Sequence, residues 1–220
     1  MKKFLAFTLA EVLVTLGIIG VVSALTVPTL MKNHQRKVFV TQLRKVYSQL
    51  SQAAEQAMTD NNAVSLSESE YAGASANNAM RFIQDSFKTV KHCTAAGDGC
   101  IPNSYKALDG STSSSSSYNT NCYVIADGAA ICHLWGDWHK EDDGDHSQVE
   151  FVVDVNSMSG PNVIGRDVFQ VIVYEDGKVG GPYDSEYSPA KADRLEVCKS
   201  GGYGGGCIDY LLLNGWKMDY

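Results

Sequence analysis

Residues 7–30 read FTLAEVLVTLGIIGVVSALTVPTL and contain a single charge, Glu11. At a rise of 1.5 Å per residue, a helix of about 20 residues crosses the roughly 30 Å hydrocarbon core of a bilayer. The run is also longer than the apolar region of about 7 to 15 residues in a secretory signal peptide, and the polar chain resumes only at Lys32. This stretch therefore predicts one membrane-spanning helix.

Glu11 is the unusual residue of this run. A carboxylate within a membrane span costs about 2.5 to 3.5 kcal/mol on insertion scales, so such a residue indicates a function and a partner. The partner that fits is an amine. The alternative is that Glu11 lies near the interface and extends its carboxylate to water.

The basic leader with Lys2 and Lys3, then Phe-Thr-Leu-x-Glu, then an apolar helix, resembles the class III signal of type IV prepilins and pseudopilins. The resemblance implies that a prepilin peptidase cuts between Ala6 and Phe7 and methylates the new amine. The residue before the cut is usually Gly in that family, and here it is Ala6.

The same resemblance assigns assembly roles to Phe7, Glu11 and Pro28. Pro28 falls at the helix-kinking proline of the family, and the Phe7 amine of a neighbouring subunit would neutralise Glu11 and set the register of a helical stack. The expected protein is a pseudopilin or minor pilin of a type II secretion system or type IV pilus. It would be a single-pass protein of a bacterial inner membrane, with a periplasmic or extracellular head, and its partners would be other pilins and the peptidase.

Two other function classes stay open: a DNA-uptake or adhesive minor pilin, and a signal-anchored periplasmic binding protein or enzyme. The chain has 18 basic and 25 acidic residues, which does not favour nucleic-acid binding. It contains no Gly-rich phosphate loop, nucleophile elbow or recognisable catalytic triad. We therefore expect no catalytic residues and no enzyme activity.

The expected organisation is a leader at 1–6, a transmembrane helix at 7–31, an amphipathic helix at 32–59 and a globular head at 60–220. Apolar residues recur every three or four positions between Phe39 and Met58, which predicts the amphipathic helix. Pro28 should kink or locally melt the helix because it lacks a backbone N–H. Basic residues gather just beyond the apolar run and could contact anionic headgroups or acidic faces of neighbouring subunits, or simply form a solvated face: Lys32, Arg36, Lys37, Arg44 and Lys45.

The head is expected to have an α+β, pilin-like fold in which an antiparallel sheet of about four strands lies on the long helix. A short helix after Asn77 or Asn78 as cap should bury Met80, Ile83 and Phe87 on one face. Residues 122–132 predict a hairpin that turns at Asp-Gly. Residues 149–155 and 168–174 are rich in β-branched and aromatic residues and predict two more strands, followed by a second turn at 175–178.

Six cysteines all follow the apolar run, which suggests an oxidising compartment and disulfide bonds. Six cysteines allow fifteen connectivities. We expect sequential pairing, because each neighbouring pair closes a short loop: Cys93 with Cys100, Cys122 with Cys132, and Cys198 with Cys207. A zinc site is disfavoured because no Cys-x2-Cys spacing occurs.

Residues 154–167 carry alternating oxygen-bearing side chains with Gly and Pro between them. Such a loop suits a hard cation, and the candidate calcium ligands are Asp154, Asn156, Asn162 and Asp167. No cofactor is otherwise expected. The alternative is a turn that uses these side chains for its own hydrogen bonds.

Residues 133–146 are dense in histidine, tryptophan and carboxylates and could bind a transition metal. The histidine spacings fit no known ligand pattern, so a solvated loop is the favoured interpretation, with Trp135 ending a strand in the core. Near the C-terminus, an apolar helix or strand should stop at Asn214-Gly215, with Trp216 packed under the sheet.

Overall fold

The computed structural model describes residues 8–73, 75–114, 121–139, 147–182, 191–200 and 205–220. The chain divides into two compact units, residues 1–38 and 39–220. The long helix α1 (Leu9–Asp60) belongs to both units, so we describe its two parts separately.

The first part of α1 carries the apolar run. Pro28 lies inside the helix, and the helical assignment continues through it without a break. The expectation of local melting at Pro28 was therefore wrong. The proline removes one backbone hydrogen bond, and the bonds of the turns on either side keep the segment helical. The large apolar side chains of this part are exposed, among them Leu13, Ile18 and Leu25.

From Phe39 onward, α1 has one buried face, as the periodicity indicated. The buried positions recur at spacings of one, three and four residues, so they form a stripe along the helix. They are Phe39, Val40, Leu43, Val46, Leu50, Ala54 and Ala57.

The sheet of the head is antiparallel and has six strands in the order β1-β4-β5-β6-β7-β8, not about four. Sequence reasoning missed β1, whose exposed residues include a lysine and a histidine, and β8, which has only two residues. The predicted strands form the centre. The strands are β1 (Thr89–Cys93), β4 (Cys122–Ile125), β5 (Ala130–Asp137), β6 (Gln148–Asp154), β7 (Val168–Tyr174) and β8 (Val179–Gly180).

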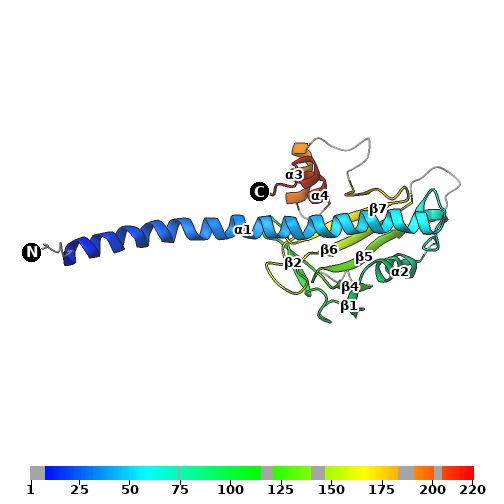
Figure 1. Cartoon of the computed structure of the whole chain (residues 1–220), viewed down its shortest axis with the longest axis horizontal. Helices are drawn as coiled ribbons and strands as arrows, with labels where there is room; N and C mark the ends of the chain where they lie inside the picture. Colours follow the sequence, from blue (N-terminus) through cyan, green and yellow to red (C-terminus); the bar gives the residue numbers. More distant parts are fainter. Residues whose placement is uncertain (1–7, 74, 115–120, 140–146, 183–190, 201–204) are drawn as a thin grey trace, which may run out of the picture. The chain divides into compact units, whose positions relative to one another are not determined.

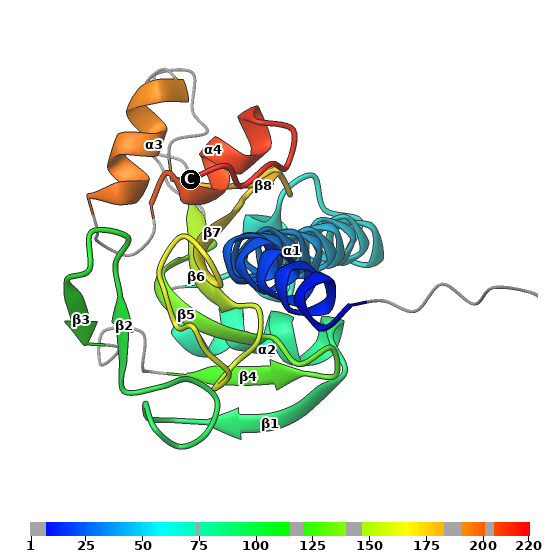
Figure 2. The same cartoon turned by 90° about the vertical axis from the view of Figure 1, so that its left-hand side faces the viewer.

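Helices cover one face of this sheet (Figure 1). The main core joins the buried stripe of α1 to α2 (Ala76–Ser86), α4 (Cys207–Leu213) and the inward side chains of β6 and β7. The opposite face carries a second, smaller core beneath the two-stranded ribbon of β2 (Ser104–Lys106) and β3 (Thr112–Ser114). Figure 2 shows this ribbon on the side of the sheet away from α1. The remaining elements are η1 (Leu66–Glu68) and α3 (Lys191–Lys199).

The β4–β5 hairpin forms as expected. The Ile125 N–H donates to the Ala129 carbonyl at 2.9 Å, so three residues make the loop, and Gly128 has a φ of 90°. A three-residue hairpin loop needs a left-handed residue before the second strand, which glycine adopts without a steric penalty. Cys122 lies directly opposite Cys132 in this hairpin.

The cap of α2 differs from the prediction. Ser75 is the N-cap, and its side chain accepts a hydrogen bond from the backbone N–H of Asn77. Asn78 instead donates from its side-chain amide to the Ala72 carbonyl at 2.7 Å. Serine caps as well as asparagine does, so the sequence did not distinguish these neighbours. The predicted apolar face is correct, since Met80, Ile83 and Phe87 are buried.

The tryptophan that fills the core near the end of β5 is Trp138, not Trp135 as expected. Trp135 is 64% exposed, whereas Trp138 is fully buried and donates its indole N–H to the Val173 carbonyl at 3.0 Å. The pairing of β5 with β6 shifts between His133 and Trp135, which marks a bulge. One inserted residue reverses which face the following side chains occupy, so Trp135 leaves the core face.

Trp216 also differs from its expected place. It is half-buried and meets Tyr47 of α1 edge to face at a centroid distance of 5.2 Å, with Arg44 stacked 5.9 Å from its ring centroid. α4 ends at Leu213 with Asn214 as its C-cap, so the predicted stop is correct. The tail after Gly215 turns onto the helix, so Trp216 does not pack under the sheet.

Candidate functional site

Glu11 caps the start of α1. Its Oε2 accepts hydrogen bonds from the Thr8 backbone N–H at 2.9 Å and the Thr8 hydroxyl at 2.8 Å, and the Glu11 N–H donates to the Thr8 hydroxyl at 3.2 Å. This reciprocal pattern is a capping box, which the Thr-x-x-Glu spacing could have predicted. The carboxylate thus has a local partner in the single chain. The processing residues Ala6 and Phe7 lie outside the described residues.

Among the described residues, α1 is the one helix long and apolar enough to cross a membrane by length and composition. A core helix of a soluble protein can meet the same criteria, but the apolar window of α1 is not buried. A signal sequence near an N-terminus also meets them. The coarse expectation of one apolar helix, either a span or a signal anchor, is therefore supported.

The six cysteines form three disulfides, paired sequentially as expected: Cys93–Cys100, Cys122–Cys132 and Cys198–Cys207. The second bond crosses the β4–β5 hairpin, and the third joins α3 to the start of α4. No free thiol remains to bind zinc or act as a nucleophile. A disulfide restricts the unfolded chain more as its loop lengthens, so each of these bonds, with a separation of 7, 10 or 9 residues, gives a smaller restriction than a long loop would.

The proposed cation loop connects β6 to β7 and brings its two aspartates together. Asp154 ends β6, and the Asp167 carbonyl accepts a 2.8 Å hydrogen bond from the Val155 N–H, which closes the loop at its base. Both aspartate side chains are fully buried. The sheet therefore holds two carboxylates at one end of the same strand pair.

Each carboxylate accepts hydrogen bonds from neighbouring groups. Asp154 accepts from the Tyr105 hydroxyl at 2.8 Å and from the Asn156 N–H at 3.2 Å. Asp167 accepts from the backbone N–H groups of Asn162 and Val163 at 2.8 and 2.7 Å. These bonds show that the loop acts as the turn that the alternative interpretation described. Sequence reasoning missed Tyr105, which reaches the loop from β2.

Burial is the main cause of the electrostatic properties of this pair. It raises the pKa of Asp154 well above the usual aspartate value, and the nearby charge of Asp167 raises it further, against the Tyr105 hydrogen bond. Burial likewise raises the pKa of Asp167 against its backbone hydrogen bonds. The folded loop therefore favours less negative charge than two free aspartates would carry.

The two asparagines leave acceptors unused. The Oδ1 atoms of Asn156 and Asn162 are buried and have no hydrogen-bond donor among the described residues. Two carboxylates and two amide oxygens are the ligand types of a hard cation such as calcium. The four sequence-predicted residues are thus all in one loop, and their chemistry fits such an ion. No group of three or more His, Cys, Asp or Glu side chains suited to a metal occurs in the described residues.

In the histidine-rich segment of residues 133–146, only residues 133–139 are described by the structure, and residues 140–146 lie outside it. His133 is buried and lies 2.9 Å from the Gly136 carbonyl, and His139 pairs with Asp137 on the same segment. These local partners explain both histidines without a metal.

Comparison with known protein families gives a match over the first half of the head and the end of the apolar run. A family of unknown function (DUF6613) matches residues 29–150, which is more than half of the chain. The chain belongs to this family. The matched range begins after most of the apolar run and ends within β6, so it includes neither Glu11 nor the loop of residues 154–167. No curated protein and no solved structure compared with the chain matches it.

Proposed function

We propose that the protein is a pilin-like structural subunit, a pseudopilin or minor pilin, of a type IV filament or type II secretion system. The observation that supports this proposal is the exposed apolar run at residues 9–30 of α1, in which Glu11 is the one charged residue. A head with an antiparallel sheet and three disulfides is compatible with a periplasmic or extracellular location.

In the proposed assembly step, the Glu11 carboxylate exchanges its hydrogen-bond partner within the chain for a group of a neighbouring subunit. In the single chain its carboxylate caps the helix through Thr8. In a filament the free amine of a neighbouring Phe7 would pair with the carboxylate, which relieves the cost of a charge in an apolar environment. One pairing per subunit would then fix the axial register of the stack.

Intact-mass analysis tests the processing step directly. Co-expression with a prepilin peptidase should remove Met1 to Ala6 and leave Phe7, with or without a methyl group, as the new N-terminus. A chain that stays uncut would support a signal-anchored periplasmic protein instead.

A pair of Glu11 variants separates the capping role from the charge-pairing role. Glu11→Gln keeps a residue that completes a capping box but removes the charge, whereas Glu11→Ala removes both. We expect both variants to insert into the membrane and neither to enter filaments, measured by shearing and immunoblotting. Glu55→Gln, an exposed position of α1, is the matched control and should assemble normally. Normal filaments from Glu11→Gln would contradict the register mechanism.

We further propose that the loop of residues 154–167 binds a divalent cation of the calcium class. The buried, unpartnered oxygens of Asn156 and Asn162 beside two buried carboxylates support it. The cation would neutralise the carboxylates and brace the β6–β7 connection; it is not required for catalysis in this proposal.

A further inference from the structure

A polar groove of about 560 Å³ lies in the head, within residues 39–220. One wall is the last part of α1, the other is the C-terminal end of α2 with Tyr71, and the β4–β5 turn closes one end. Ala53 and Ala57 line it, and their short side chains leave depth beside the helix. The volume falls in the range of about 300 to 1,000 Å³ that ligand sites occupy.

The α1 wall presents hydrogen-bond acceptors. The side-chain amide groups of Gln49, Gln52 and Gln56 donate to Asp127, Ser48 and Asp60, at 3.1, 3.1 and 2.6 Å. Their donors are thus directed to neighbours, which leaves the amide oxygens for another group. The Gln49 Oε1 is buried and has no donor among the described residues. A buried acceptor without a donor is unfavourable unless a ligand supplies one.

Three carboxylates line the same groove: Asp60, Asp85 and Asp127. Lys88 also lines the groove, and Lys45 and Arg81 pair with two of its carboxylates. Lys45 pairs with Asp127 at 2.7 Å, and Arg81 pairs with Asp85 at 3.4 Å.

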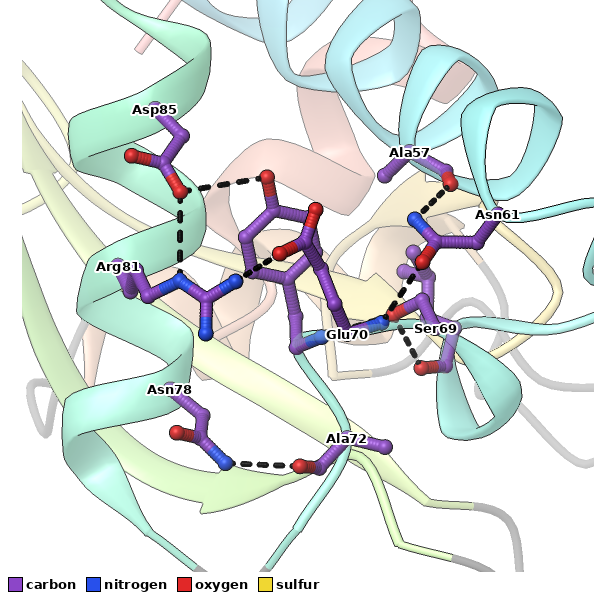
Figure 3. A network of polar contacts seen from close by, with 10 residues as sticks. Ala57, Asn61, Ser69, Glu70, Ala72, Asn78, Arg81 and Asp85 are labelled. Carbon is purple, nitrogen blue, oxygen red and sulfur yellow. Dashed lines mark hydrogen bonds and ion pairs between the residues drawn. The ribbon is translucent and has the colours of Figure 1, made fainter.

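Arg81 already pairs with two carboxylates, so its guanidinium is not available to bind a ligand in the groove. Figure 3 shows it between Asp85 and Glu70, bonded to both, and its guanidinium lies 5.3 Å from the Tyr71 ring centroid. The Tyr71 hydroxyl also reaches the Asp85 Oδ2 that Arg81 uses. The other oxygen of Asp85 has no donor among the described residues, so Asp85 keeps an acceptor for a ligand.

We propose that this groove binds the guanidinium or ammonium group of a basic peptide. The charged and amide side chains that line the groove are three carboxylates, three glutamines and Lys88, so acceptor oxygens outnumber its one cation and match a ligand that carries several N–H donors and a positive charge. A guanidinium has five donors in a planar fork, which suits a wall of amide oxygens facing a carboxylate. This inference is independent of the filament proposal, because it concerns only the head.

Titration of the full-length chain in detergent with Nα-acetylated argininamide (argininamide below) tests the proposal, with Nα-acetylated citrulline amide (citrulline amide below) as the neutral probe of nearly the same shape. Isothermal titration calorimetry should show argininamide binding that weakens with salt, and no measurable binding of citrulline amide. Asp60→Asn/Asp85→Asn should weaken argininamide binding about tenfold or more, because charge-assisted hydrogen bonds are lost.

Glu55→Gln is the control for removing an acidic charge from α1 outside the groove, since Glu55 is exposed on α1 but does not line the groove. It should bind argininamide as the wild type does. Equal binding of both probes, no binding of argininamide, or equal weakening by Glu55→Gln would each overturn the proposal. Far-ultraviolet circular dichroism and the melting temperature establish that the double variant is folded before its affinity is compared.

Discussion

At the scale of single residues, the hydrogen-bond partners of a polar side chain determine its structural role. Glu11 is a cap in the single chain because Thr8 lies three positions before it. Asp154 and Asp167 are buried carboxylates that a turn already uses, yet the amide oxygens beside them remain unsatisfied. Residue type and spacing found these groups, but only the fold shows which hydrogen bonds they already make.

The raised pKa of Asp154 gives a pH prediction with a defined sign. Its folded-state pKa lies above the unfolded value, so its contribution to stability is fully present below the ordinary aspartate pKa of about 4 and is lost as pH rises through the raised value. Without a cation, Asp154→Asn should therefore gain stability relative to the wild type as the pH is raised, measured by thermal unfolding across this range.

Calcium should reverse that difference, because it favours the ionised carboxylates. At about pH 8, millimolar calcium should raise the melting temperature of the wild type and leave that of Asp154→Asn unchanged, with a smaller wild-type shift at about pH 5. Asp176→Asn, in the turn after β7, is the control and should respond to calcium as the wild type does. If neither calcium nor a chelator changes the melting temperature of the wild type, the loop binds no calcium and serves only as a turn.

At the scale of elements, the bulge in β5 decides which tryptophan supports the core. Trp138 contacts Phe82 of α2 edge to face, at a centroid distance of 5.1 Å, and bonds the Val173 carbonyl of β7. It thereby joins a helix to the sheet. Trp135, displaced to the other face by the bulge, is opposite Glu150 in the register and is mostly exposed.

Two alanine variants test this assignment. Trp138→Ala should lower the free energy of unfolding by about 3 to 5 kcal/mol, because it empties a fully buried site and removes the indole hydrogen bond to the Val173 carbonyl. Trp135→Ala should change it by only about 0.5 kcal/mol, as for other exposed positions. Chemical denaturation of both variants gives the comparison, and a larger loss for Trp135→Ala would mean that the register after His133 is wrong.

At the scale of the whole molecule, the chain consists of an apolar helical unit and a head that contains its own core. The head core begins at Phe39 and includes the buried stripe of α1, both faces of the sheet and all three disulfides. The second part of α1 therefore belongs to the core of the head, as expected of an amphipathic helix that continues into it. The compact unit of the head begins at Phe39.

This boundary predicts which fragment can fold. Residues 33–220, produced in an oxidising compartment, should be soluble and unfold in one cooperative transition. Residues 61–220 should fail to fold, because they lack the helical stripe that covers the sheet. Circular dichroism melting and disulfide mapping compare the two fragments, and a cooperative transition in the shorter one would contradict the role of α1 in the core.

The sequence by itself determined the features that depend on local pattern: the apolar run, the stripe from Phe39, the central strands and the hairpin with Cys122 opposite Cys132. Each follows from a periodicity or a turn that neighbouring residues define. Only the tertiary structure decided the six-stranded sheet, the burial of Trp138 in place of Trp135, the position of Trp216 on α1 and the approach of Tyr105 to Asp154. These depend on a one-residue bulge and on contacts between distant segments, and local periodicity contains no information about either.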